Sequence, residues 1–332
     1  MEMTKSTTTV APAAAVARSG HGWLRWGLER GPEISLIVLC LAFGGLSETF
    51  LSVHNLLNVL DQITVIGIMA LGMTAVIVIG GIDLSVGSVL ALSMMVMGWL
   101  ANAHAVPMPL AMAAALAVGA LCGAVSGLLV TWANLPPFIA TLAMMSVARG
   151  LANLVTDGQQ IVGYPEWFDA LSTTRYFGVL SPTVGALVAL TALAAVFLSY
   201  RPTGRALFAI GGSSEVARLA GIKVKPITTW VYVVSGVLCG LAGIVMSARL
   251  DSSQPSGALG YELDTIAAVV LGGASLRGGT GSVRGTVIGV LIIGILRNGL
   301  NLIGLSPFVQ QIVIGAVIAL AVAVDANKRR LR

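Results

Sequence analysis

Charged side chains are scarce in this chain, and long stretches of it have none. Asp, Glu, Lys and Arg make up 10% of its 332 residues, whereas they make up roughly a quarter of an ordinary soluble domain. The segment 84–148 contains no formal charge and is much longer than the ~20 residues that one membrane crossing takes. It must therefore fold back on itself in apolar surroundings. This pattern excludes a soluble globular domain and predicts a membrane protein.

Cysteine and histidine are also few, with three of each. The cysteines lie in apolar runs and the histidines are scattered, so their spacing predicts no disulfide framework, metal site or catalytic triad. The glycine-rich segment 272–285 lacks the Gly-Lys-Ser/Thr ending of a phosphate-binding loop, and we interpret it as a tight turn between two spans. We predict no active site, no cofactor and no metal, and therefore not an enzyme.

The apolar runs predict an all-α, polytopic helical bundle in a bacterial inner membrane. We expect a cytoplasmic N-terminal tail at 1–32, a transmembrane domain at 33–325 and a basic cytoplasmic C-terminal tail at 326–332. About ten spans are expected, at 33–51, 63–80, 84–102, 107–131, 137–156, 179–200, 226–248, 262–276, 284–304 and 307–325. The segments 80–87 and 262–276 are either full crossings or re-entrant helices, since glycine and carboxylates at membrane depth need protein or water around them.

The distribution of positive charge predicts the orientation. Lys and Arg concentrate in residues 1–30, 201–225, 277–284 and 328–332, which the positive-inside rule assigns to the cytoplasm. Six spans return the chain to that side at 201–225, and ten place the C-terminus there. This distribution of positive charge reflects the orientation of the chain in the membrane and does not indicate a nucleic-acid partner. The C-terminal basic cluster is expected to lie at anionic lipid headgroups.

Residues 201–225 form a basic, polar island between two uncharged apolar runs. Ser213 or Ser214 is suited to cap a short helix near Glu215, and Gly221 to end it. Such a helix at the cytoplasmic face has little to pack against except the membrane surface or a soluble partner, so we predict a docking element. The predicted docking residues are Gly204, Arg205, Glu215, Ala217, Arg218, Ala220 and Gly221.

Glycine spacing indicates how the spans are expected to pack, and a faint internal repeat indicates how they are arranged. Glycines recur every four residues at 119–127, 236–240 and 281–289, which favours close helix–helix contact. Leu-Pro-Pro-Phe-Ile at 135–139 and Leu-Ser-Pro-Phe-Val at 305–309 each open a span. Five crossings separate them, so the two copies enter the membrane from opposite sides. We therefore predict a pseudo inverted repeat, which is a common transporter arrangement.

Four segments together resemble the ribose-type ABC permease family: 80–87, 204–212, 261–275 and 298–302. The resemblance runs from about residue 34 to 325 and implies a monosaccharide importer subunit that works as a permease pair, a homodimer. It also implies a cytoplasmic ATPase with two nucleotide-binding cassettes and a periplasmic sugar-binding protein as partners. Glu215 to Gly221 is similar to the loop that docks such permeases onto their ATPase. Ribose, xylose, galactose and an autoinducer-type furanose all fit as the sugar.

Six polar residues within or beside the spans are candidates for the translocation path. For Asp83 and Ser85 the alternative is a cap on the following helix. For Arg149, which has Asn153 one turn further on, it is an ion pair between helices. For Glu262 and Asp264 the alternative is a role at a helix N-terminus. Arg297 departs from the family pattern, and we expect it to snorkel or to pair with an external carboxylate.

A second class of function stays open at this point. An ion-coupled secondary transporter for a small polar solute also has many apolar spans, but it is expected to bind its ion on carboxylates near the membrane midplane. Here the acidic residues cluster at the ends of spans. Together with the docking island, this favours a permease that is driven by a soluble motor.

Overall fold

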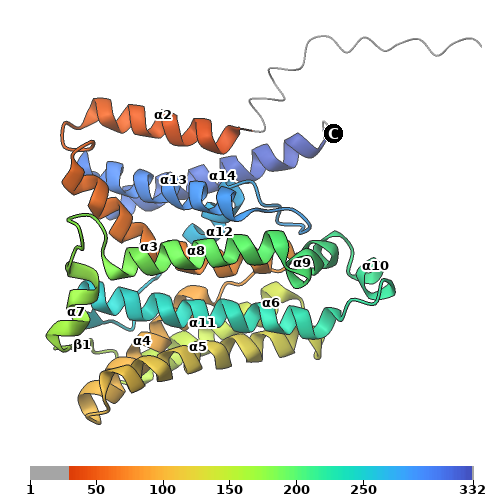
Figure 1. The fold of residues 1–332 in the computed structure, drawn as a ribbon, viewed down its shortest axis with the longest axis horizontal. Helices are drawn as coiled ribbons and strands as arrows, with labels where there is room; N and C mark the ends of the chain where they lie inside the picture. The colour runs from red at the N-terminus through yellow and green to blue at the C-terminus, as the bar shows by residue number, and fades with distance from the viewer. Residues whose placement is uncertain (1–29, 331–332) are drawn as a thin grey trace, which may run out of the picture.

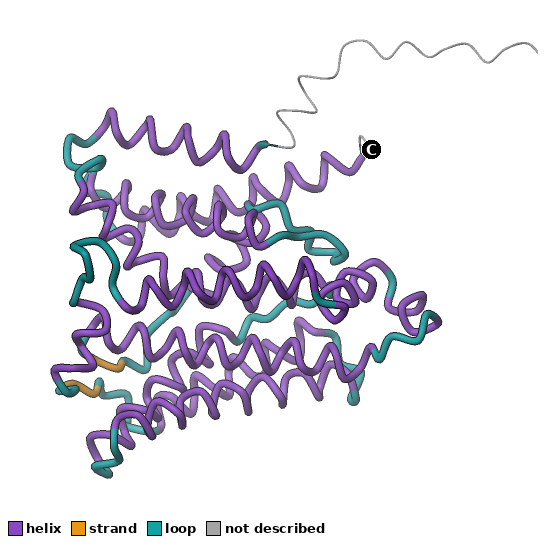
Figure 2. Tube along the Cα trace, in the orientation of Figure 1, coloured by secondary structure: helices purple, strands orange, loops and turns teal. Residues whose placement is uncertain are grey.

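A computed structural model describes residues 30–330 of the chain. Most of the predicted N-terminal tail and the last two residues of the C-terminal tail therefore lie outside the described residues. The described part is helical apart from loops and one two-stranded antiparallel sheet (Figure 2). Its elements are α2 (Gly31–Leu46), α3 (Val53–Val78), α4 (Val86–Ala103), α5 (Met108–Thr131), α6 (Pro137–Leu154), β1 (Ile161–Val162), α7 (Glu166–Thr173), α8 (Pro182–Tyr200), α9 (Pro202–Gly212), α10 (Ser214–Leu219), α11 (Val224–Leu250), β2 (Ser252–Ser253), α12 (Tyr261–Leu271), α13 (Val283–Leu302) and α14 (Pro307–Arg330).

Seven helices of the described chain are long and apolar enough to cross a membrane, namely α3, α4, α5, α6, α8, α11 and α13. The helix α2 is shorter, and the described apolar part of α14 is Pro307–Leu320. The all-α membrane bundle is thus confirmed, whereas the count of about ten spans is not. The difference is largest at 262–276, because α12 has only 11 residues and at 1.5 Å per residue covers about half of a ~30 Å hydrocarbon layer.

The long helices lie side by side, with connections at the two ends of the bundle (Figure 1). α7 and β1 lie at one end, which we call the α7 end. α9 and α10 lie at the other, which we call the α10 end, and α14 runs toward it (Figure 1). α6 leads into β1 and α7, so it starts at the α10 end, whereas α14 starts at the α7 end. The two Pro-Phe segments therefore open helices at opposite ends, as an inverted repeat requires.

Glycine governs the closest helix contacts, as the sequence predicts. A Cβ atom on Gly119 of α5 would collide with the carbonyl oxygen of Gly236 in α11, and a Cβ on Gly236 would collide with that of Gly119. In the same way, Gly285 of α13 packs on the backbone of Gly272 at the end of α12. Lipid gives helices little hydrophobic reason to associate, so such close packing supplies much of the attraction between them.

The helix α3 forms the centre of the bundle, and most of its apolar stretch is buried. It ends at Val78, and the chain then runs in a non-helical conformation from Ile79 to Ser85 before α4 begins. Gly80 has a φ of +81°, a conformation that suits glycine. The segment 80–87 is therefore a break between two helices of the bundle and does not form a span of its own.

Candidate functional site

Polar side chains gather at the α7 end around two adjacent cavities, of about 200 and about 490 Å³. We call this region the polar mouth. The smaller cavity is lined by Gln62, Ile66, Arg249, Tyr261, Gly294, Arg297, Asn301 and Gln310. The larger is lined by Asn58, Asp61, Gln62, Ser172, Thr173, Arg175 and Arg249. Six helices contribute to this lining, namely α3, α7, α11, α12, α13 and α14, so residues far apart in the sequence meet here. A polar surface of this kind suits a hydrophilic solute.

One wall of the polar mouth holds a buried ion pair. Arg297 of α13 binds the carboxylate of Asp264 in α12, and the Asp264 side chain is only 3% exposed. The guanidinium also lies 5.3 Å from the ring centre of Tyr261, within the range of a cation–π contact. Of the two alternatives for Arg297, snorkelling and pairing with a carboxylate, the structure shows the pair. Its Nε atom is buried and has no hydrogen-bond partner among the described residues.

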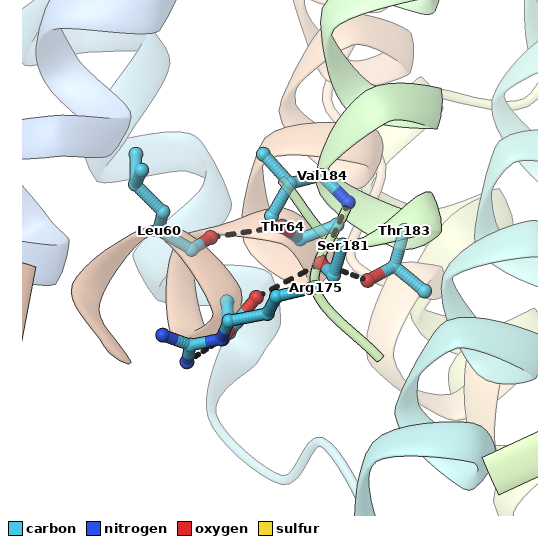
Figure 3. Close-up of polar contacts among 7 residues, drawn as sticks. Leu60, Thr64, Arg175, Ser181, Thr183 and Val184 are labelled. Carbon is cyan, nitrogen blue, oxygen red and sulfur yellow. Dashed lines mark hydrogen bonds and ion pairs between the residues drawn. The ribbon is translucent and has the colours of Figure 1, made fainter. Parts of the chain in front are cut away.

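A second ion pair organises the opposite wall. Asp61 of α3 accepts hydrogen bonds from Arg175 at 2.8 Å and from the Ser181 hydroxyl at 3.0 Å. Ser181 caps α8 by accepting from the N–H of Val184, and it also lies 3.0 Å from the hydroxyl of Thr183 (Figure 3). Asp61 therefore anchors both ends of the loop between α7 and α8.

The sequence reasoning missed Asp61 and its neighbours. Asn58, Asp61 and Gln62 follow an i, i+3, i+4 pattern, which places them on one face of a helix. That pattern is a readable signal for a polar stripe. It was overlooked because the second span was expected to begin only at residue 63, whereas α3 begins at Val53.

Asp83 and Ser85 lie inside the bundle, at the break between α3 and α4. The carboxylate of Asp83 accepts hydrogen bonds from the Ser85 N–H at 2.9 Å and the Ser85 hydroxyl at 2.6 Å. The hydroxyl of Ser235 in α11 also donates to it, at 3.3 Å. Both Asp83 and Ser85 are buried. Asp83 does not cap α4, because Ser85 is the N-cap residue and no side-chain cap bond is present there. Its carboxylate instead bonds the turn before the helix and is engaged within the protein.

Arg149 and Asn153 lie on α6, away from the polar mouth. Arg149 donates from one nitrogen to the carbonyl oxygens of Pro255 at 2.5 Å and Gly257 at 3.0 Å, and so fastens the loop that leads into α12. The expected ion pair is not found among the described residues, because these backbone carbonyls take the place of a carboxylate. Asn153 is exposed and donates to the backbone oxygen of Arg149.

The two remaining candidates for the translocation path, Glu262 and Asp264 of α12, lie at different places in the structure. The carboxylate of Asp264 pairs with Arg297 at the polar mouth, whereas the carboxylate of Glu262 lies close to Gly87 at the start of α4. Of the six candidates for the path, the structure thus brings only Asp264 to the polar mouth, through its partner Arg297. The others lie at the helix break or beside the loop before α12.

The predicted docking helix forms as α10 at the opposite end of the molecule. Ser213, and not Ser214, provides the cap by accepting from the Val216 N–H at 3.3 Å. Gly221 follows the helix with a φ of +82°, and the N–H of Ile222 reaches back to the Ala217 carbonyl at 3.0 Å, a left-handed C-terminal turn.

The surface of this helix is unusually apolar for an exposed element. Val216 is 64% and Leu219 77% exposed, whereas Ala217 is buried. Glu215, Arg218, Ala220 and Arg205 are exposed beside them. Gly204 is buried against the end of α8, where a Cβ would clash with the backbone. Its local contribution is therefore packing, whereas the other six predicted docking residues lie on or around α10 and α9.

Comparison with known proteins places these features in a family. A family model described as "branched-chain amino acid transport system / permease component" matches residues 55–322. A ribose import permease protein of Escherichia coli (strain K12) is 46% identical over 312 residues, 92% of this chain and 95% of that protein. One from Bacillus subtilis (strain 168) is 44% identical over 90% of this chain and 92% of its own. A D-allose transport system permease protein of E. coli K12 is 36% identical, covering 96% and 98%. No solved structure matches the chain.

The two hydrogen bonds that the Arg149 side chain donates predict that truncating this side chain lowers the stability of the protein measurably. Arg149→Ala removes both hydrogen bonds and leaves the Pro255 and Gly257 carbonyls without this donor. Hydrogen bonds to charged groups contribute about 1.5–3 kcal/mol, so we expect a lower midpoint of thermal unfolding in detergent. Arg201→Ala is the matched control, because Arg201 is exposed; Arg175 is unsuitable, since it is bound to Asp61. Equal midpoints for the two variants would show that the Arg149 contacts do not hold the loop.

Proposed function

The chain belongs to the permease family whose model it matches over residues 55–322, and from this premise we propose that it is the membrane subunit of a binding-protein-dependent ABC importer for a monosaccharide such as ribose. The observation that carries the proposal is the 46% identity to a ribose import permease over 95% of that protein. The family description names amino acids, but relatives that match nearly end to end are named for ribose and allose.

We propose that the α10 end faces the cytoplasm and the α7 end faces the periplasm. The positive charge of residues 201–225 supports this orientation. The helices α2, α12 and α14 then join the other seven as ten membrane-embedded segments, and α12 together with the glycine-rich loop after it makes one crossing from the α7 end to the α10 end. Exposed leucines such as Leu41, Leu121 and Leu193 contact lipid or the second permease copy.

The energy for transport comes, in this proposal, from a cytoplasmic ATPase that docks on α10. The exposed Val216 and Leu219 supply an apolar contact, and Glu215 at the helix N-terminus suits both the helix dipole and a basic group on the partner. A periplasmic sugar-binding protein delivers the solute to the polar mouth. The chain itself is a transport subunit and carries out no hydrolysis.

An ion-coupled transporter is the alternative, and the state of the carboxylates disfavours it. Such a transporter needs carboxylates that are available to a proton or a cation. Asp61 and Asp264 are each bound to an arginine, and Asp83 accepts three hydrogen bonds from serines. Each of these inward-facing acids is therefore already engaged by the protein.

The proposed function is tested by the energy source of uptake. In cells that express the complete importer, uptake of radiolabelled D-ribose should stop when ATP is depleted while the proton gradient is kept intact. It should continue when the gradient is collapsed and ATP is maintained. The reverse pattern would establish ion coupling and contradict the proposal.

Coupling to the ATPase should depend on the turn at Gly221. A valine at a φ of +82° is strained, because left-handed backbone costs an L-residue roughly 1–2 kcal/mol and a β-branched side chain more. We expect Gly221→Val to reach the membrane but to lose both uptake and binding-protein-stimulated ATP hydrolysis. Glu215→Lys should have a similar but milder effect.

Gly45→Val is the matched control for this prediction. Gly45 is helical, and a Cβ there meets nothing within 4 Å, so uptake and stimulated hydrolysis should be unchanged. A Gly221→Val permease that is normally expressed and keeps full stimulated activity would show that α10 is not the docking element.

A further inference from the structure

The two cavities of the polar mouth share Gln62 and Arg249. Arg249 lies in the last turn of α11, where the helix dipole favours a cation. The larger cavity, of about 490 Å³, falls within the ~300–1,000 Å³ of small-molecule sites. Gln62 and Arg249 are therefore the groups that a small solute meets in either cavity.

Arg249 differs from the other two arginines of the polar mouth in having no counter-ion. Arg175 is paired with Asp61 and Arg297 with Asp264. Among the described residues, no hydrogen bond or ion pair engages the Arg249 side chain, and Asp61 is the one acid that lines either cavity. Five guanidinium N–H donors are thus left available to water or to a solute.

Neutral amides supply most of the remaining polar groups. No hydrogen bond within the described protein engages the side chains of Asn58, Gln62 or Asn301, while Gln310 donates to the Leu305 carbonyl at 2.9 Å. Each free amide has two donors and an acceptor. The buried Nε of Arg297 also lacks a partner, and buried donors are rarely left unbonded. The side chains that line the smaller cavity therefore carry more unused hydrogen-bond donors than acceptors, but unused amide acceptors are also present.

Hydroxyl groups match this set, because each hydroxyl both donates and accepts. A cationic solute is disfavoured by the unpaired Arg249. An anion would accept from Arg249 and from the amide N–H groups, but it would leave the amide carbonyls of Asn58, Gln62 and Asn301 without donors. We propose that the polar mouth is a receiving site for a neutral polyhydroxylated solute, with Arg249 and Gln62 as its central hydrogen-bonding groups. This inference rests on the proposed function as an importer and assigns its site of entry.

The site can be tested by protection of an introduced cysteine in the full importer, in a background without Cys40, Cys122 and Cys239. Thr173→Cys, at an exposed position that lines the larger cavity, should react with a small hydrophilic thiol reagent, and D-ribose or D-allose should slow that reaction several-fold. Sodium gluconate at the same concentration should not. Gln310→Cys, which lines the smaller cavity, gives a second reporter on another helix, should Thr173→Cys fail to fold. Glu166→Cys is the control, because Glu166 is exposed on α7 and does not line either cavity.

The outcomes are separable from those of the proposed function. Protection by gluconate alone would overturn the neutral class of solute, and protection by none of the three compounds would overturn the site, whether or not the importer takes up ribose. Conversely, protection without ATP-dependent uptake would retain the site and contradict the proposed function.

Arg249→Gln provides a functional readout at the same site. Because Arg249 has no partner among the described residues, its replacement leaves no unpaired charge behind there. We expect ribose uptake to fall about tenfold, as for the loss of one charge-assisted hydrogen bond, with unchanged membrane levels and stimulated ATP hydrolysis. Arg277→Gln is the control, because Arg277 is exposed, lies outside 201–225 and lines neither cavity; it should not alter uptake. Unchanged uptake in Arg249→Gln would remove Arg249 from the site.

Discussion

The whole structure depends on the satisfaction of backbone hydrogen bonds where helices are interrupted inside a membrane. Lipid offers no partner for a free N–H or C=O group, so non-helical backbone must be bonded by the protein. Here the break after α3 is closed by the Gly81 N–H, which donates to the Val76 carbonyl at 2.9 Å, and by the Gly279 N–H, which donates to the Val78 carbonyl at 2.8 Å. The loop before α12 is held by Arg149. Each interruption is therefore tied to another helix or loop.

These interruptions lie between the two functional ends of the molecule. Gly211 of α9 packs directly against the backbone of Val78 and Gly279, and Gly278 packs against Gly80. The backbone next to the docking helix is thus in contact with the break that precedes Asp83. At the other end, α12 carries Asp264, whose partner Arg297 lines the polar mouth. The helix breaks connect the proposed docking and receiving sites through direct packing, which gives the proposed ATPase a physical route to the entry site.

The sequence predicted the parts of this arrangement that depend on local pattern. Apolar runs located the long helices, the glycine ladder at 119–127 located the contact of α5 with α11, and capping residues located α10. For Arg297 it left two alternatives open, snorkelling and a pair with a carboxylate, and it did not identify Asp264 as the partner. These features follow from composition and from spacing along one helix, which a sequence displays directly.

The features that the sequence did not predict arise from contacts between distant segments. Nothing near Arg149 indicates that its partners are the carbonyls of Pro255 and Gly257, since backbone acceptors carry no residue signature. The polar mouth combines residues from six helices, and only the Asn58–Asp61–Gln62 face of α3 is visible in the sequence. The length of α12 was overestimated because an apolar composition does not reveal where the backbone leaves the helix.

The central claim is that the molecule has a docking end in the cytoplasm and a receiving end in the periplasm. It is tested most directly by the accessibility of single cysteines, in a cysteine-free background, at Ser214 on α10 and Glu166 on α7. Both positions are exposed. In intact spheroplasts an impermeant thiol reagent should label Glu166→Cys and not Ser214→Cys, and in inverted membrane vesicles the pattern should reverse. Labelling of both positions from the same side, or of Ser214→Cys alone in spheroplasts, would contradict this account.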